Sequence, residues 1–137
     1  EVLVTEEFLR TADIFQLKYL HVTAGTTVLP MASLELKIND RPVRAAGYGN
    51  GPIDAAFNTI AKLTGTQSEL LRFTVSALSG GTDAQGEVTV RLRENGLVAL
   101  GKGADPDIIT ASAKAYINGL NRLEYLKSHP IKDRQGL

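Results

Sequence analysis

Apolar and polar residues alternate with period two in several short runs of this chain, a pattern that predicts β-strands. In one such run Leu34 and Leu36 fall on one face of the strand and Glu35 falls on the other. A strand with this pattern buries one side and leaves the other side in solvent. Strands are predicted over residues 15–25, 31–38, 43–46, 70–78, 88–92 and 97–100.

Segments rich in turn-forming residues separate these runs. Asn39 to Pro42 and Glu94 to Gly96 are short enough to predict β-hairpins. Looser breaks occur at Gly25, at Pro30 and from Ser79 to Asp83, where glycine and proline interrupt the alternation. The strands are therefore expected to form two groups of three.

Two longer stretches repeat their apolar residues at helical spacing. The first helix is predicted to stop at Thr64 and Gly65, and the second is predicted from Pro106 to about Lys127. Gly119 falls in the middle of the second helix, where glycine costs roughly 1 kcal/mol relative to alanine. Close approach of another backbone would explain its presence. The first stripe contains Ile53, Ala56, Phe57, Ile60 and Leu63, and the second contains Ile108, Ala111, Ser112, Ala115, Tyr116, Gly119, Leu120 and Leu123.

The two halves of the chain repeat each other at a spacing of 54 residues, without a gap. Such a duplication predicts two βββα units that pack together in an α+β fold, because one unit alone buries too little. We expect the first unit over 15–65 and the second over 69–127. Residues 1–14 are expected to be a linker remnant with a short helix over 5–10, and 128–137 a flexible tail. The shift takes Tyr19 to Phe73, Leu34 to Val88, Leu36 to Val90, Ile38 to Leu92, Ala45 to Ala99, Gly47 to Gly101, Gly49 to Gly103 and Pro52 to Pro106.

Each unit carries closely spaced glycines just before its helix, over 47–52 and 101–106. We interpret both stretches as loops in which glycine permits a tight turn or a positive φ. Each ends in a proline, which the first turn of a helix tolerates well. A helix start without bulky side chains offers free N–H groups to an anion. The pair therefore predicts a small-anion site, and the alternative is that both loops are only tight turns.

The composition narrows the possible classes of function. A chain of 137 residues with 43% hydrophobic content forms one ordinary domain. Its 15 basic and 15 acidic residues leave no net charge, which argues against a partner that is a nucleic acid or an anionic membrane. No apolar run reaches the roughly 18 residues that span a bilayer. The chain starts at Glu1 without a visible signal peptide, as expected of a fragment or processed product, and its lack of cysteine is in keeping with a reducing, cytoplasmic compartment.

Catalytic patterns are missing from the sequence. The G-x-G-x-G run lacks the spacing of a dinucleotide site, and no Gly-Lys-Ser/Thr follows it as a Walker loop requires. His21 and His129 lie far apart with no metal-ligand spacing, and we interpret each as an ordinary histidine. Asp105 and Asp107 stand at a helix start, where capping explains them without catalysis. The residues alone thus predict a module that binds a small anion or an amino acid.

Four stretches of the chain resemble the C-terminal regulatory domain of the 2-isopropylmalate synthase family, which acts in leucine biosynthesis. The last two stretches are the more specific, and citramalate synthases, a related family with isoleucine-sensing domains, usually lack them. The four stretches are His21-Val-Thr-Ala-Gly-Thr-Thr-Val-Leu-Pro-Met-Ala32, Gly49-Asn-Gly-Pro-Ile-Asp-Ala-Ala-Phe57, Gly80-Gly-Thr-Asp-Ala-Gln-Gly-Glu-Val-Thr-Val90 and Gly103-Ala-Asp-Pro-Asp-Ile-Ile-Thr-Ala-Ser-Ala-Lys-Ala-Tyr116.

This resemblance implies a homodimeric domain that binds L-leucine near the dimer interface and inhibits a catalytic barrel from a distance. The barrel, with its divalent metal and its acetyl-CoA and 2-oxoisovalerate sites, has no counterpart here, so no cofactor or enzymatic activity is expected of this chain. Phe73 stands where relatives often carry tyrosine. A purely structural dimerisation module is the alternative. The effector residues implied by the motifs are Gly49, Gly51, Pro52, Ile53, Leu70, Phe73, Ala77, Ala84, Gly86, Ala104, Asp105 and Pro106.

Overall fold

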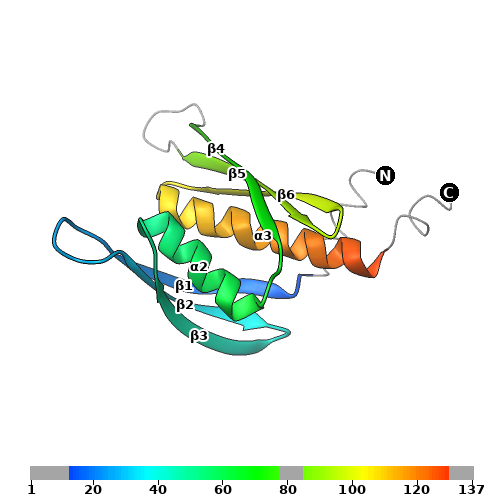
Figure 1. Ribbon diagram of the computed structural model, residues 1–137, viewed down its shortest axis with the longest axis horizontal. Coiled ribbons are helices and arrows are strands. Elements are labelled where there is room, and N and C mark those ends of the chain that lie inside the picture. The colour runs from blue at the N-terminus through cyan, green and yellow to red at the C-terminus, as the bar shows by residue number, and fades with distance from the viewer. Residues whose placement is uncertain (1–12, 78–84, 130–137) are drawn as a thin grey trace.

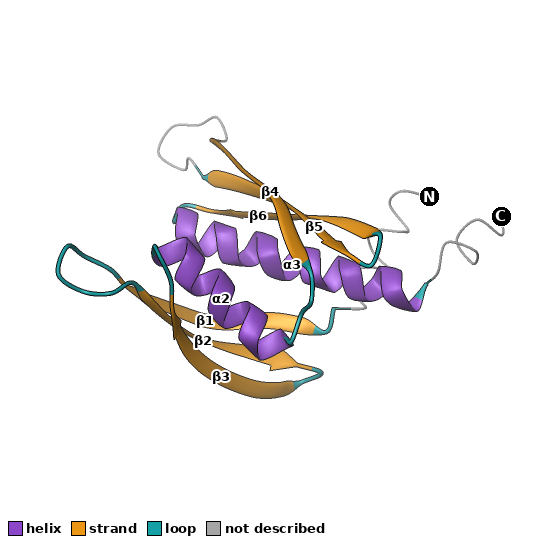
Figure 2. Cartoon of the chain, in the orientation of Figure 1, coloured by secondary structure: helices purple, strands orange, loops and turns teal. Residues whose placement is uncertain are grey.

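Two helices lie between two three-stranded antiparallel sheets (Figure 1). The computed structural model describes residues 13–77 and 85–129. Each sheet is followed by one helix, so the predicted α+β fold of two βββα units is confirmed (Figure 2). Sheet A consists of β1 (Phe15–Thr23), β2 (Met31–Ile38) and β3 (Arg41–Tyr48) and precedes α2 (Pro52–Thr64); sheet B consists of β4 (Glu69–Ala77), β5 (Gly86–Glu94) and β6 (Leu97–Asp105) and precedes α3 (Ile108–Ser128).

Tight turns join the second and third strands of both sheets. Asn95 and Gly96 have φ values of 51° and 82°, which fit the predicted Asn-Gly hairpin. In sheet A the turn is shorter than predicted, because Asn39 and Asp40 alone take positive φ values of 51° and 69°. Residues 41 and 42 already belong to β3, an edge strand, where a proline removes no ladder hydrogen bond.

The alternating residues of the central strands form the core. Leu34 and Leu36 of β2 and Val88 and Val90 of β5 are fully buried, as their period-two pattern predicts. Leu120 of α3 lies in the same cluster. Both units therefore share one hydrophobic core between the sheets, as expected when a single unit buries too little surface.

The glycines of the second predicted loop lie in a strand, so that prediction was wrong. Gly101 and Gly103 belong to β6, and neither has a positive φ. A Cβ atom on Gly103 would lie 2.5 Å from the carbonyl oxygen of Ala111, and one on Gly101 would overlap the backbone of Gly119. These glycines let α3 approach the sheet closely. The expected backbone neighbour of Gly119 is confirmed, since its Cβ position lies 3.5 Å from the Cα of Gly101.

The repeat is free of gaps in the central strands but not in the first strand of each unit. Tyr19 pairs with Glu35, whereas Phe73 pairs with Val90, one position away from the expected partner. Both strands contain an irregularity, between Leu17 and Tyr19 in β1 and between Leu70 and Arg72 in β4, and the two do not fall at equivalent places. The predicted equivalence of Tyr19 and Phe73 is therefore wrong, and the slip turns Phe73 toward the helices.

The buried side-chain amide of Asn121 links α3 of the second unit to the first strand of the first unit. Asn121 of α3 accepts hydrogen bonds of 2.9 Å from the N–H groups of Ile14 and Phe15 through Oδ1. Its Nδ2 donates to the carbonyl of Phe15 at 2.9 Å. Asn121 is only 6% exposed, so these three bonds satisfy backbone groups that water cannot reach easily.

Side chains also bond to the edges of the other outer strands. Asn118 Oδ1 accepts from Lys102 N at 2.9 Å, and Arg122 donates to Leu100 O at 3.2 Å, so α3 covers the edge of β6. Asn58 donates to Tyr48 O at the edge of β3. Among the described residues, β4 has no such side-chain bond to its backbone.

Strand β4 is exposed along its whole length. On the side that faces the helix layer, α2 contacts β4 through Phe57 and Phe73, whose ring centroids lie 6.0 Å apart, yet the residues of β4 stay exposed. Leu70, Phe73 and Val75 point to that side, because each pairs with a buried residue of β5. They are 42%, 37% and 48% exposed, which leaves an apolar strip along β4.

Candidate functional site

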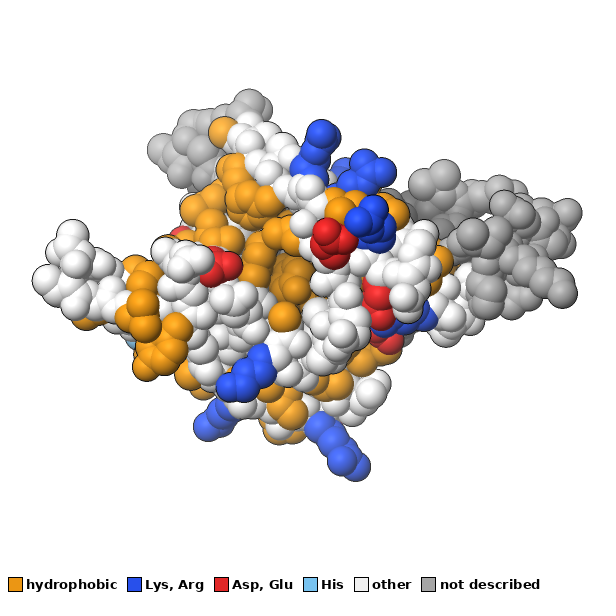
Figure 3. All heavy atoms as spheres, in the orientation of Figure 1, with side chains coloured by type: hydrophobic (Ala, Val, Ile, Leu, Met, Phe, Trp, Pro, Cys, Tyr) orange, Lys and Arg blue, Asp and Glu red, His pale blue; other side chains and the backbone are white. Residues whose placement is uncertain are grey.

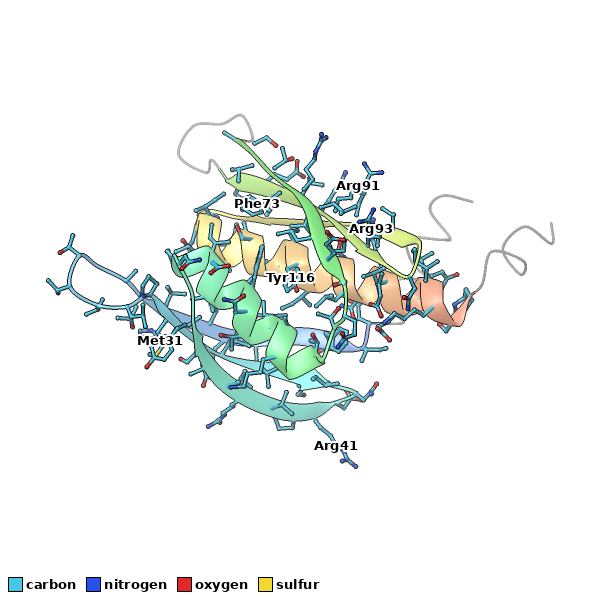
Figure 4. All side chains as sticks on the ribbon, in the orientation of Figure 1. Met31, Arg41, Phe73, Arg91, Arg93 and Tyr116 are labelled. Atoms are coloured by element: carbon cyan, nitrogen blue, oxygen red, sulfur yellow. The ribbon has the colours of Figure 1, made fainter. Side chains whose placement is uncertain are left out.

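An apolar groove lies between α2 and β4, and aromatic rings form its floor. Figure 3 shows hydrophobic side chains gathered in a hollow between these elements. The ring centroids of Phe57 and Phe73 lie 6.0 Å apart in a T-shaped arrangement. Those of Phe57 and Tyr116 lie 4.6 Å apart, and these two rings are stacked. Phe73 comes from β4 and Tyr116 from α3, and both are labelled in Figure 4. The groove therefore joins the two units.

Phe57 and Tyr116 were not among the predicted site residues. Both lie on the helical stripes, so the periodicity indicated only that they belong to the core. Burial raises the pKa of the Tyr116 phenol above its ordinary value, which keeps the group neutral at physiological pH. Aromatic residues on both stripes, one on each helix, were the signal available in the sequence.

The start of α2 is open at Gly51. This glycine is the N-cap, with φ −159° and ψ 176°, and no side chain caps the helix. A Cβ atom on Gly51 would meet nothing within 4 Å, so the space beside it is free. Pro52 follows in the first turn and Ile53 packs against the core. No side chain thus caps the first-turn N–H groups, although the Asp54 carboxylate of this turn accepts from the Asn50 N–H at 2.8 Å.

Gly49 has a different role from the one predicted. Its φ is not positive, so no unusual turn requires glycine there. A Cβ atom would lie 2.7 Å from the Cα of Ala55, and the Gly49 N–H donates to Pro30 O at 3.1 Å. Gly49 therefore holds the chain against the first turn of α2 and brings the helix start close to the β1–β2 connection.

The start of α3 is already capped by the Asp107 carboxylate, so it does not add a second open helix start to the predicted small-anion site. The helix begins at Ile108, and Pro106 lies outside it rather than in its first turn. Asp107 is the N-cap, as capping predicted, and accepts from Ile109 N at 3.4 Å and Thr110 N at 3.2 Å. The N–H groups that would bind an external anion are used within the chain.

Two ionised carboxylates make this second helix start negative. The backbone N–H of Asp107 and the ammonium of Lys114 bond to Asp105 at 2.9 Å and 3.1 Å and lower the pKa of its carboxyl. The Thr110 hydroxyl bonds to Asp107 at 2.7 Å and lowers its pKa as well. Both groups therefore carry charge at neutral pH and suit a cationic ligand group.

The remaining predicted residues divide between the two faces of sheet B. Ala77, Gly86 and Asp105 pair in one row on the helix side. A Cβ on Gly86 would lie 2.7 Å from Ile108 Cδ1, so this glycine lets α3 begin against the sheet. Ala104 pairs with Glu87 on the opposite face and does not line the groove. Ala84 lies outside the described residues.

Both helices begin at the same end of the molecule, beside the end of β4 and the start of β5 (Figure 1). The open start of α2, the acidic start of α3 and the aromatic floor therefore belong to one region. Within residues 13–77 and 85–129, no cluster of three or more potential metal ligands occurs. No helix of the described part is long and apolar enough to cross a membrane.

A family model described as "LeuA allosteric (dimerisation) domain" matches residues 1–124. The chain belongs to this family. The LeuA domain is 53% identical over 127 residues to 2-isopropylmalate synthase of Syntrophus aciditrophicus, a match that covers 93% of this chain and 25% of that protein. It is 49% identical over 138 residues to 2-isopropylmalate synthase of Nitratidesulfovibrio vulgaris, covering 100% of this chain and 26% of that protein. This LeuA domain thus spans about a quarter of the length of the curated relatives that it matches.

The resemblance to the regulatory part of 2-isopropylmalate synthases is therefore confirmed. A relative from Heliobacterium modesticaldum carries the same name and is 42% identical over 90% of the chain, with 24% of that protein covered. The family description names both allosteric regulation and dimerisation, which agrees with a groove and an uncovered apolar strip in one small LeuA domain.

Proposed function

We propose that this LeuA domain binds L-leucine in the region between the two helix starts and β4, and that binding regulates a catalytic domain in the same polypeptide. One observation supports this proposal above others. An uncapped helix start, an acid-capped helix start and an apolar groove adjoin, and a zwitterionic amino acid with an apolar side chain needs all three.

The ligand's charged groups match the two helix starts. The leucine carboxylate accepts hydrogen bonds from the first-turn N–H groups of α2 beside Gly51, where the helix dipole favours negative charge. The ammonium is attracted by Asp105, whose carboxylate stays ionised beside Lys114. Charge-assisted hydrogen bonds of this kind are stronger than neutral ones, so they fix the orientation of the amino acid.

The apolar side chain of leucine lies along the strip of β4. Leu70, Phe73 and Ala77 supply its contacts, with Phe57 behind them. Shape alone separates leucine from isoleucine or valine by about 1–3 kcal/mol per methylene, so we expect real but incomplete selectivity. A preference for isoleucine would instead support the citramalate synthase alternative.

Dimerisation through β4 completes the site. Leu70, Phe73 and Val75 leave apolar surface in water, and association of two chains removes it. The same strand has the edge to which no described side chain bonds. A second copy related by a two-fold axis would present the same strip in return. The effector and the dimer partner thus share β4.

Regulation follows from linkage between binding and arrangement. If leucine binds one arrangement of the dimer better than another, its binding free energy shifts the equilibrium between them. The catalytic groups, any divalent metal and the acyl-transfer chemistry belong to the part of the relatives that this chain does not span. The chain itself acts as a sensor without cofactor.

Calorimetric titration of the purified chain with L-leucine, isoleucine and valine tests this proposal. We expect heat of binding, strongest with leucine, and a rise in melting temperature with leucine concentration. No heat and no melting shift at millimolar leucine, with a dimer still present by sedimentation, would support the purely structural module instead.

A further inference from the structure

The face of sheet B that points away from the helices carries a cluster of cations. Arg72 of β4 lies directly opposite Arg91 of β5, and Arg91 lies opposite Leu100 of β6. In the next row on this face, Thr74, Thr89 and Lys102 lie side by side. Figure 4 shows Arg91 directed away from the helix layer, and Figure 3 shows basic side chains gathered over sheet B. We call Arg72, Arg91, Lys102, Thr74 and Thr89 the basic face.

The cations of the basic face form no ion pair within the described chain, although Glu69 and Glu87 lie in the flanking rows of the same face. Among the described residues, no carboxylate forms an ion pair with Arg72, Arg91 or Lys102, whereas neighbouring Arg93 pairs with Glu69 at 2.8 Å. Like charges placed directly opposite each other on a sheet destabilise it. The stability of the fold therefore does not explain why Arg72 and Arg91 face each other.

The corresponding face of sheet A in the first unit contains an ion pair. Glu35 of β2, which the repeat places at the position of Thr89, forms an ion pair of 2.7 Å with Arg44 on the outer face of sheet A. Lys37 corresponds to Arg91, so both units keep a cation there, and the second unit has Thr89 in place of the acid that forms the ion pair in the first unit.

The surface around these cations suits a protein partner. A shallow hollow of about 320 Å³ is lined by Arg72, Thr74, Thr89 and Arg91. Leu100 beside it is 45% exposed, and Val98 in the adjacent row is 39% exposed. Arginine is enriched at protein interfaces and binds carboxylates in a bidentate manner. This combination of apolar residues and cations is therefore suited to binding a protein surface that bears carboxylates.

We propose that the basic face docks on an acidic surface of the remaining part of the polypeptide, the part that makes up about three-quarters of the curated relatives. The opposite face of β4 is the one assigned above to leucine and the dimer partner, so both faces can be engaged together. Arg72 and Phe73 are adjacent on β4 and point to opposite sides. A shift of β4 on leucine binding therefore moves Arg72 against the docked surface; only this transmission rests on the proposed function.

Zero-length carbodiimide cross-linking of the full-length protein tests the docking directly, without a variant. This reagent joins an amine to a carboxylate in contact with it. We expect a cross-linked peptide that joins Lys102 to an Asp or Glu in the larger part of the chain. Cross-links at Lys102 that stay within residues 1–137, or none at all, would overturn the proposal.

A charge-reversal pair tests its role in regulation. In the full-length protein, Arg72→Glu with Arg91→Glu should raise the leucine concentration for half inhibition at least about tenfold, within the usual range of allosteric coupling. Lys18→Glu with Lys37→Glu on sheet A, the matched control, should change it less than about twofold. An equal effect of both pairs, or no effect of the first, would count against the basic face. If Lys102 cross-links while leucine gives no heat of binding, the docking holds and the proposed leucine function fails.

Discussion

The Cα atom of Gly101 lies 3.5 Å from the position of a Cβ atom on Gly119, so the backbones of β6 and α3 are in direct contact at this crossing. A side chain on Gly101 would force a main chain to move, whereas a Cβ atom on Gly119 would first meet the Leu92 side chain at 2.8 Å. This relationship fixes how closely the second helix packs on its sheet.

Gly101→Ala should therefore destabilise the fold strongly. The added methyl group would overlap the backbone of Ala115 and Gly119, and overpacking of this kind costs about 1–3 kcal/mol. Gly25→Ala is the control, because its Cβ atom would meet only Val28 at an ordinary 3.5 Å. Urea denaturation measures the free energy of unfolding of both variants. Equal free energies of unfolding for the two variants would show that the close contact has no energetic importance.

Asn121→Ala should separate the first strand from the second unit. The substitution leaves the N–H groups of Ile14 and Phe15 and one carbonyl without partners, and each unsatisfied buried group costs about 1–3 kcal/mol. Asn118→Ala, on the same helix, removes a single bond to an exposed strand and should cost about 1 kcal/mol. Hydrogen exchange of the Phe15 amide should accelerate only in the first variant. Unchanged exchange there would contradict this link between the two units.

Gly51→Ser should stabilise the free protein and weaken leucine binding. A serine N-cap accepts a hydrogen bond from the first turn of α2 and is worth a few tenths of a kcal/mol more than glycine. The same bond uses an N–H group assigned to the leucine carboxylate, so the dissociation constant should rise about tenfold, or about 1.4 kcal/mol. Gly51→Ala, which adds bulk but no acceptor, should have the smaller effect. If Gly51→Ser and the wild type bind leucine with equal affinity, the leucine carboxylate does not bind at this helix start.

Val75→Lys should convert the dimer into a monomer. The side chain lies on the uncovered strip of β4, and an unpaired ammonium there would have to be desolvated on association. Ser76→Lys places the same charge on the opposite face of the strand and should leave the dimer intact. Sedimentation velocity distinguishes the two species. A dimer in both variants would place the interface elsewhere.

Asp107 should contribute to stability in a pH-dependent manner. Its pKa is lowered from the ordinary 3.8, so its contribution is fully present above that value and is lost as the pH falls through the lower folded-state pKa. Asp107→Asn keeps a capping oxygen but carries no charge. The free energy of unfolding of this variant should therefore fall less steeply with acid below pH 3.8 than that of the wild type. Parallel curves would mean that another carboxylate controls acid unfolding.

Local patterns were sufficient for most of the fold. The alternation around Leu34 and Val88 identified the buried faces of both central strands, and the duplication predicted two units with a common core. Gly65 has φ 69° in the left-handed region, as its position at the end of α2 predicted. These features depend on residues within a few positions of each other.

Features that depend on distant residues could not be predicted in the same way. A glycine pair before a helix indicates a loop as readily as a close helix crossing, and only the position of Gly119 distinguishes them for Gly101. Asn121 bonds to residues 106 and 107 positions away. For the candidate site, the start of α2 was predicted correctly as an open helix start, whereas the negative start of α3 depends on which residue provides the cap.

The exposed edge of β4 also bears on how many copies can join. In the described part of the chain, helix side chains bond to the backbone of the other outer strands at one or two positions each, whereas none bonds to the backbone of β4. Two chains that meet there across a two-fold axis use up each other's free edge. In a dimer of this kind, growth at the β4 edge would stop at a closed pair.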